Sequence, residues 1–198
     1  MPRLAKFSHE QIVDATARIA ARAGPAHVTM AAIADEVKAP TGSIYHRFGS
    51  RDLLLAEVWL RAAADFQMAY IEKLAGDDPW EAGLAAVLFV PARVRERPDE
   101  ARILILHRRE DFLTGEWPAE MASRAAALKR QVDDAHRAFC KRLLGRTDAE
   151  SLRALRYALV DAPLAAILPD LRVGKAPPPL LDPLLRATYV AVVGEKRK

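Results

Sequence analysis

The stretch from residue 29 to residue 51 constrains the fold of this chain more than any other segment. It contains two short helical patterns. Thr29 can cap the first pattern, whose apolar positions end at about Val37. Pro40 suits the first turn of the second helix, where its missing N–H leaves no hydrogen bond unmade. The connection between the two helices is too short for anything but a sharp corner, so the segment predicts a helix-turn-helix.

The second helix of this motif begins with small residues and continues with hydrogen-bond donors. Thr41, Gly42 and Ser43 would let the backbone come close to another surface, and Tyr45 and His46 can donate hydrogen bonds to it. A helix that only filled a hydrophobic core would not need these side chains. The pattern therefore indicates a helix that meets a polar surface.

Clear start and stop signals surround this corner. Ser8 and Gln11 have the spacing of a capping box, so a first helix should begin directly after Ser8 and end at Gly24. Ser50 can cap a long fourth helix, which should run until Gly76. Three short helices are therefore expected to precede one long helix.

This combination of signals resembles the TetR family of one-component bacterial transcriptional regulators. The matching residues are the string Gly42–Phe48, the segment Ser50–Leu53, and the pairs at 28–29 and 33–34. The similarity covers about the first sixty residues, and beyond them it is one of length and helical layout.

Two positions depart from the family pattern. Lys38 stands where the family often has a glycine at the end of the second helix, so Lys38 must adopt a left-handed conformation or the turn must differ. Pro40 stands where a capping serine is common, which would start the recognition helix one residue later.

The resemblance implies an all-α protein of about nine helices. Residues 1–51 would form a three-helix DNA-binding head, with the helix-turn-helix at about 29–48, and a long helix would join this head to the body. Residues 52–198 would form a helical domain for effector binding and dimerisation. The implied function is that of a homodimeric repressor, which a small-molecule effector releases from a palindromic operator in double-stranded DNA.

Carried over residue by residue, the resemblance implies a DNA-binding surface made of backbone groups, hydroxyls and basic side chains. These residues are Thr29, Thr41, Gly42, Ser43, Tyr45, His46 and Arg51. Arg51 is expected to reach a phosphate. Thr29 is a helix cap in any case, and Tyr45 has an alternative role as a half-buried packing residue.

The resemblance also implies an effector pocket between the long fourth helix and the fifth to seventh helices. The candidate lining residues are mainly aromatic, namely Trp59, Phe66, Trp80, Phe89, Ile105, His107, Arg108, Phe112 and Trp117. Aromatic residues at helical spacing are also ordinary core residues. His107 and Asp111 lie four apart and could form a metal pair on a helix, but two ligands do not make a site, and neither a metal nor another cofactor is expected.

The last two helices of the body have apolar stripes that the resemblance assigns to a dimer interface. One should begin at a capping box of Thr147 and Glu150 and reach about Leu168, and the other should run from Pro183 to Val193. The expected interface residues are Leu152, Leu155, Leu159, Ala162, Ala166, Leu184, Thr188 and Val192. The same stripes could instead close the core of a single subunit.

Charge is unevenly distributed along the 198 residues, whose net charge is +4. Up to Arg51 there are seven Lys or Arg against four Asp or Glu, a balance of +3, whereas the remainder has 23 against 22. Arg3 and Lys6 lie in an expected flexible arm. A basic head fits contact with DNA phosphates.

The remaining signals exclude other classes of protein. The single Cys140 permits no disulfide within the chain, and it fits either a buried apolar position or a redox sensor. With neither a signal peptide nor a membrane span expected, the protein should be cytoplasmic. There is no phosphate-binding loop, zinc motif or nucleophile elbow, so an enzyme is not expected. A ligand-independent architectural DNA-binding protein is the alternative function.

Overall fold

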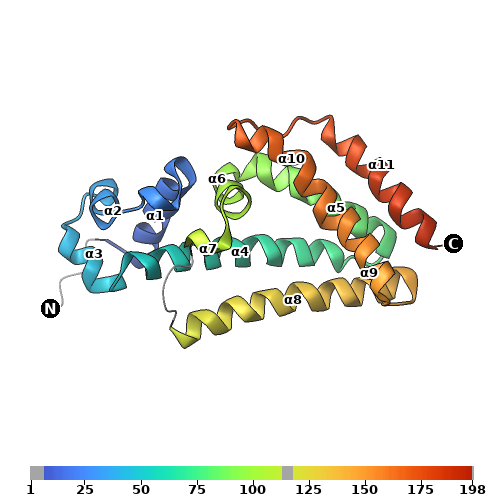
Figure 1. Cartoon of the computed structure of the whole chain (residues 1–198), viewed down its shortest axis with the longest axis horizontal. Coiled ribbons are helices and arrows are strands. Elements are labelled where there is room, and N and C mark those ends of the chain that lie inside the picture. Colours follow the sequence, from blue (N-terminus) through green and yellow to red (C-terminus); the bar gives the residue numbers. More distant parts are fainter. Residues whose placement is uncertain (1–6, 113–117, 198) are drawn as a thin grey trace. The chain divides into compact units, whose positions relative to one another are not determined.

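The computed structural model describes residues 7–112 and 118–197, with only the backbone described at 197. These residues form helices and turns, and no strand occurs among them (Figure 1). The all-α class expected from the sequence is confirmed. Arg3, Lys6 and Trp117 lie outside the described residues. Within the described ranges, no helix is both long and apolar enough to cross a membrane.

The chain divides into two compact units, each of which combines segments that are distant in sequence. The first consists of the described residues within Met1–Ala63 and Asp99–Ala125, and the second of those within Ala64–Pro98 and Ala126–Lys198. This division differs from the boundary expected between residues 51 and 52. The difference arises because residues that follow the fifth helix pack with the N-terminal helices.

The first unit contains the N-terminal helices and a short helical segment from the middle of the chain. Its elements are α1 (His9–Ala23), α2 (Met30–Val37), α3 (Thr41–Phe48), the start of α4 (Arg51–Leu74), α6 (Pro98–Ala101), the π-helical η2 (Arg102–Leu106), α7 (Arg109–Phe112) and the start of α8 (Ala119–Leu144). Buried side chains of α1 to α4 form one hydrophobic cluster with Ile103 and Phe112. The middle segment therefore belongs to the core that holds the head.

The expected caps in the first unit are confirmed. The Ser8 hydroxyl accepts a hydrogen bond from the Gln11 backbone N–H, and the Gln11 side chain accepts one from the Ser8 N–H. Thr29 caps α2 by accepting from the Ala32 N–H at 3.0 Å, and Ser50 accepts from the Leu53 N–H at 3.2 Å. Each cap provides a partner for an N–H group that the first turn of its helix leaves unpaired.

The turn between α2 and α3 depends on Lys38, which has left-handed backbone angles of φ 56° and ψ 44°. The Lys38 N–H donates to the Asp35 carbonyl oxygen at 3.2 Å, and the Ala39 N–H donates to that of Ala34 at 2.9 Å. This pair of bonds is the Schellman arrangement, which ends a helix sharply. Pro40 lies just outside α3, so the recognition helix begins at Thr41.

The second unit consists of longer helices. It contains the end of α4, α5 (Pro79–Glu96), most of α8, α9 (Ala149–Arg156), the π-helical η3 (Tyr157–Asp161), α10 (Ala162–Arg172) and α11 (Leu181–Gly194). Its α5, α10 and α11 pack against one another, as Figure 1 shows. A separate hydrophobic cluster, which includes Phe139, Leu159 and Tyr189, forms the core of this unit.

The α9–α10 region begins and ends at other residues than those predicted from the sequence. Asp148, and not Thr147, is the N-cap, because the Asp148 carboxylate accepts from the Ser151 N–H at 2.9 Å. The helical path then continues through η3 to Arg172 instead of ending near Leu168. Pro163 accounts for the π-helical stretch, since it has no N–H to donate to the carbonyl group four residues earlier.

Arg95 holds the proline-containing connection that leads into α11. Its guanidinium group donates to the carbonyl oxygens of Pro177 at 2.8 Å and Pro178 at 3.0 Å, and both terminal nitrogens reach the Asp182 carboxylate. Proline has no N–H with which to anchor such a segment through backbone pairing. Arg95 therefore fixes where α11 starts against α5.

Candidate nucleic-acid interface

The recognition helix α3 has one buried side and one exposed side. Ile44 and Phe48 are buried in the core of the first unit, and their spacing of four residues places them on one side of the helix. Thr41, Gly42, Ser43, Tyr45 and His46 are all exposed. The residues predicted from the start and middle of this helix therefore lie together on a surface open to a partner.

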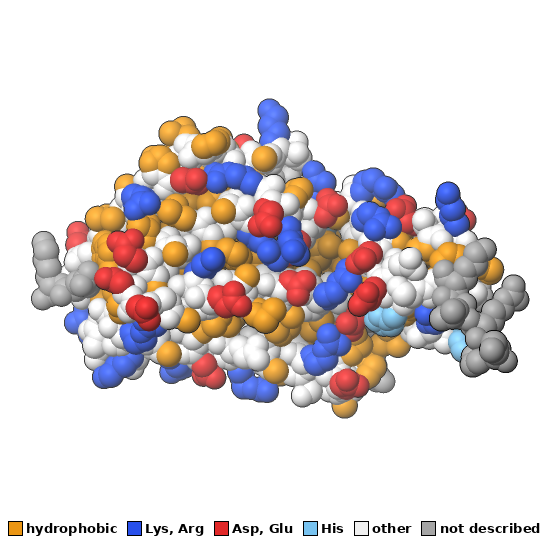
Figure 2. Space-filling view, turned by 180° about the vertical axis from the view of Figure 1, so that it is seen from behind, with side chains coloured by type: hydrophobic (Ala, Val, Ile, Leu, Met, Phe, Trp, Pro, Cys, Tyr) orange, Lys and Arg blue, Asp and Glu red, His pale blue; other side chains and the backbone are white. Residues whose placement is uncertain are grey.

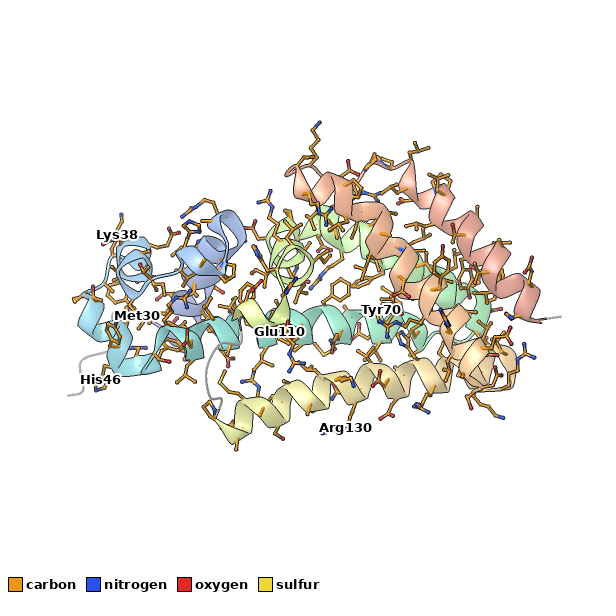
Figure 3. The ribbon with its side chains drawn as sticks, in the orientation of Figure 1. Met30, Lys38, His46, Tyr70, Glu110 and Arg130 are labelled. Carbon is orange, nitrogen blue, oxygen red and sulfur yellow. The ribbon has the colours of Figure 1, made fainter. Side chains whose placement is uncertain are left out.

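Tyr45 is the largest apolar group on this surface, with 51% of its area exposed. That exposure argues against the half-buried packing role that the sequence left open. A phenol ring of this kind can contact a sugar or a thymine methyl group, while its hydroxyl donates to a phosphate. His46 also projects outward from α3 (Figure 3).

Gly42 leaves room for a close approach to the backbone. A Cβ atom placed on Gly42 would meet no atom within 4 Å. The glycine is therefore not required by packing inside the unit. Its absent side chain leaves the start of α3 accessible to another molecule.

Arg51 lies in a different environment from the one expected. Its guanidinium group donates to the carbonyl oxygens of Val28 and Pro25, both at 2.5 Å, and to the Asp52 carboxylate at 3.1 Å. These bonds join the start of α4 to the segment before α2. The structure therefore gives Arg51 a role inside the head, which the sequence pattern did not reveal.

Two exposed basic residues were not among the predicted contacts. Arg47 follows His46 on α3, and Lys38 occupies the turn just before that helix (Figure 3). The donor character of Arg47 was visible in the sequence, but its exposure depends on which side of α3 is buried. Lys38 was singled out only for its backbone conformation.

The predicted effector residues are divided between the two units. Trp59, Ile105, His107, Arg108 and Phe112 belong to the first unit, whereas Phe66, Trp80 and Phe89 belong to the second. The structure therefore does not gather them into one group within either unit. Trp117 lies outside the described residues.

Most of the candidates in the first unit have structural partners. Phe112 is fully buried in the core, and the His107 ring packs edge-on against it with centroids 6.0 Å apart. The Trp59 ring lies 5.4 Å from the guanidinium carbon of Arg109. Arg108 is exposed. Phe112 is thus an ordinary core residue, which was the alternative to a role in lining an effector pocket.

The second unit contains an aromatic group that combines predicted and unpredicted residues. The rings of Phe66 and Phe89 are 5.3 Å apart, and the Tyr70 hydroxyl lies 2.9 Å from Nε2 of His136. Burial raises the pKa of Tyr70 and lowers that of His136, because it disfavours the charged form of each. A protonated Tyr70 hydroxyl and a neutral His136 ring therefore share this hydrogen bond.

Gln67 adds an unusual polar atom to this region of α4. Its side-chain oxygen is buried and accepts no hydrogen bond from the part of the chain that the structure describes. A buried amide oxygen without a donor is unfavourable and rare. Gln67 and His136 were not among the residues predicted from the sequence, since neither residue type stands out in a helical pattern.

The predicted dimer residues fall into three groups. Leu155 and Leu159 are buried in the core of the second unit, with exposures of 2% and 0%, so they cannot meet another subunit. Leu184 is 53% exposed. The remaining residues are partly buried, namely Leu152, Ala162, Ala166, Thr188 and Val192. The apolar stripe predicted from α9 is thus mainly the internal side of that helix.

Metal and thiol chemistry find little support in the described residues. No three His, Cys, Asp or Glu side chains among them are close enough to hold a metal ion. Cys140 is buried, and burial raises the pKa of its thiol. A raised pKa keeps the thiol protonated, which is the opposite of what a redox sensor needs.

Comparison with known families identifies the N-terminal part of the chain. Residues 12–58 match the model of the bacterial regulatory proteins, tetR family. This match spans α1 to the first part of α4 and includes the exposed surface of α3. No relative with a curated function matches the sequence at a significant level.

Solved structures extend the likeness to the whole chain. PfmR from Thermus thermophilus, a TetR-family regulator, is 20% identical, with a TM-score of 0.65 over 92% of this chain and 97% of its own. A TetR-like regulator from Rhodococcus sp. RHA1 is 18% identical, with a TM-score of 0.67 over 98% and 99%. FadR from Bacillus subtilis, solved with stearoyl-CoA, is 13% identical, with a TM-score of 0.68 over 94% and 98%.

These matches agree with the helix-turn-helix and its exposed recognition helix. The matching family consists of regulatory proteins, and the structural neighbours share the helical layout over nearly the full length. Residues 12–58 thus match the tetR-family model over the helix-turn-helix, and the chain has the fold of the TetR-family transcriptional regulators.

Proposed function

We propose that this protein is a homodimeric repressor that binds a palindromic operator and leaves it when a small effector binds. The observation that carries the proposal is the surface of α3, on which Thr41, Gly42, Ser43, Tyr45 and His46 are exposed while Ile44 and Phe48 anchor the helix. A short helix of this kind fits the major groove and reads a few base pairs. A repressor of this type acts in the cytoplasm, where bacterial DNA is located.

The dimer interface that we propose uses exposed apolar residues around η3 and α11 of the second unit. Tyr157 lies in η3 between α9 and α10, Leu180 directly precedes α11, and Leu184 and Val190 lie on α11; all four are about half exposed or more. Hydrophobic side chains also gather at the end of the molecule formed by the C-terminal helices (Figure 2). Exposed apolar side chains that gather on a surface are typical of a protein interface. Two subunits joined there would present two heads to a palindrome.

The effector site that we propose lies in the second unit, around the aromatic residues Phe66 and Phe89. The unpaired Gln67 oxygen supports this choice, because a ligand that donates a hydrogen bond would remove an unfavourable buried group. The stearoyl-CoA in the FadR structure makes a long-chain acyl-CoA the first effector to test. A ligand can release DNA only if it binds the DNA-free conformation more tightly, so bound operator must weaken effector binding by the same factor.

The experiment that tests the proposal is selection of a DNA sequence by the purified full-length protein, followed by gel shifts at several salt concentrations. We expect an inverted repeat that is preferred over random duplex, a steep loss of affinity with salt, and a penalty of about 1–3 kcal/mol for each mismatched base pair. Equal affinity for selected and random duplex would reject the repressor and support an architectural DNA-binding protein.

The effector part is tested with stearoyl-CoA and the variant Gln67→Leu. We expect the acyl-CoA to weaken operator binding by wild type, and Gln67→Leu to reduce that response while it retains operator affinity without ligand. A full response in Gln67→Leu would show that the signal enters elsewhere.

A further inference from the structure

Lys38 combines an unfavourable backbone conformation with a free charge. Among the described residues it is the one non-glycine residue with positive φ. Its side chain is exposed, and within the described part of the chain its ammonium group makes no ion pair or side-chain hydrogen bond. Glu36, two residues earlier on the same helix end, is instead paired with Arg18 and Arg22.

The backbone at this position would be more stable with glycine. The Schellman bonds from Lys38 and Ala39 require left-handed angles at residue 38 whatever its side chain is. A Cβ atom is unfavourable in that region, and glycine avoids this penalty. No contact of the Lys38 side chain within the described part of the unit accounts for the lysine, which directs attention to a partner outside the fold.

The location of Lys38 points to the outside partner. The residue lies two positions before Pro40, and α3 begins directly after that proline. In a helix-turn-helix the recognition helix enters the major groove while the preceding helix crosses the DNA backbone, so the turn between them lies near the phosphates. A lysine provides a long flexible arm with a point charge, which suits a phosphate.

We infer that Lys38 binds a DNA phosphate beside the recognition helix, and that its strained turn is retained for this contact. The inference rests on the DNA-binding function proposed above. It adds one phosphate contact for each head, and hence two for a dimer. Because a phosphate contact carries no sequence information, Lys38 strengthens binding to every duplex.

The test compares Lys38→Gly, Lys38→Asn and Lys38→Arg with wild type on a random-sequence duplex long enough for both heads. Glycine removes the charge and the strain, asparagine removes the charge but tolerates the left-handed conformation, and arginine keeps the charge. Lys175→Asn, in the second unit, makes the same change in net charge and serves as the matched control. Affinity is measured across a salt series, and thermal unfolding is measured for each variant.

We expect Lys38→Gly and Lys38→Asn to decrease the slope of log affinity against log salt by about 1.8 for a dimer, while Lys38→Arg and Lys175→Asn keep the wild-type slope. Between 50 and 200 mM salt, wild type should thus lose roughly 12-fold more affinity than either uncharged variant. Lys38→Gly should unfold at the wild-type temperature or above it.

Two results would overturn the inference. One is a wild-type slope in both uncharged variants. The other is a Lys38→Gly protein that unfolds at lower temperature, because Lys38 would then act within the fold. If wild type itself fails to bind DNA, the proposed function fails; if wild type binds and the variants match its slope, only the role of Lys38 fails.

Discussion

A Cβ atom placed on Gly83 of α5 would lie 2.1 Å from the hydroxyl oxygen of Tyr189 on α11. The same atom would lie 2.8 Å from the Phe139 ring of α8. The Tyr189 hydroxyl donates to the Trp80 carbonyl oxygen at 3.2 Å, so the tyrosine cannot move aside without losing this bond. Gly83 therefore allows three helices of the second unit to meet closely.

The variant Gly83→Ala should be less stable than wild type. Inserting a methyl group into a filled core typically costs about 1–3 kcal/mol, which exceeds the gain of about 1 kcal/mol from replacing glycine in a helix. We expect urea denaturation to show a lower free energy of unfolding. Gly42→Ala is the control, because its Cβ meets no atom within 4 Å and the variant should gain about 0.5–1 kcal/mol. Equal stability of Gly83→Ala and wild type would contradict the packing.

Arg51→Ala should destabilise the head by about 1–3 kcal/mol, because the carbonyl groups of Val28 and Pro25 would lose their charged donor. Arg51→Lys should restore little of the lost stability, since one ammonium group cannot reproduce the forked donor geometry of a guanidinium group. Denaturation and the salt dependence of DNA binding check the two roles. Unchanged stability with a shallower salt dependence would instead support the phosphate contact expected from the sequence.

Leu184→Glu and Leu159→Glu should fail in different ways. Leu184 is 53% exposed, so a carboxylate there should leave the subunit folded but prevent apolar contact with a second copy. Leu159 is fully buried, so an unpaired carboxylate should cost several kcal/mol, on the order of the whole stability of a domain, and unfold the second unit. Sedimentation and circular dichroism distinguish the two. A folded, dimeric Leu184→Glu would place the interface elsewhere.

The stability of the protein should fall as pH drops below about 6.5, the ordinary pKa of histidine in the unfolded chain. Burial lowers the folded-state pKa of His136, against a smaller opposing effect of Asp133, so the unfolded chain binds more protons in this window. The slope for one histidine is at most about 1.4 kcal/mol per pH unit. His136→Gln keeps an acceptor for Tyr70 but cannot titrate.

We therefore expect the stability of wild type to fall more steeply with decreasing pH than that of His136→Gln. Urea denaturation at several pH values between about 7.5 and 5.5 checks this expectation. The pKa values of Asp148 and Glu150 are lowered from the ordinary values of carboxyl groups, which already lie below this pH range. These two residues therefore do not titrate within it. Identical pH slopes for the two proteins would show that His136 is not buried in its neutral form.

Local signals in the sequence were sufficient to predict the helices of the head and their caps. The Ser8 capping box and the Thr29 cap were predicted and occur in the structure, and of the two alternatives left open at residue 38 the left-handed conformation is the one observed. The exposed face of α3 also follows from sequence, because Ile44 and Phe48 lie four apart and fix the buried side. These features depend on residues only a few positions apart, and such interactions are the same in any fold.

Features that depend on distant residues were decided by the tertiary structure. Whether the apolar stripe of Leu155 and Leu159 meets α5 or another subunit cannot be determined from its periodicity, because both environments select the same side chains. The partners of Arg51 lie 23 and 26 residues earlier in the chain, and no spacing rule links them. The sequence therefore determined where the helices of the head begin and end, while the packed structure determined which side chains remain available to DNA, to an effector or to a second subunit.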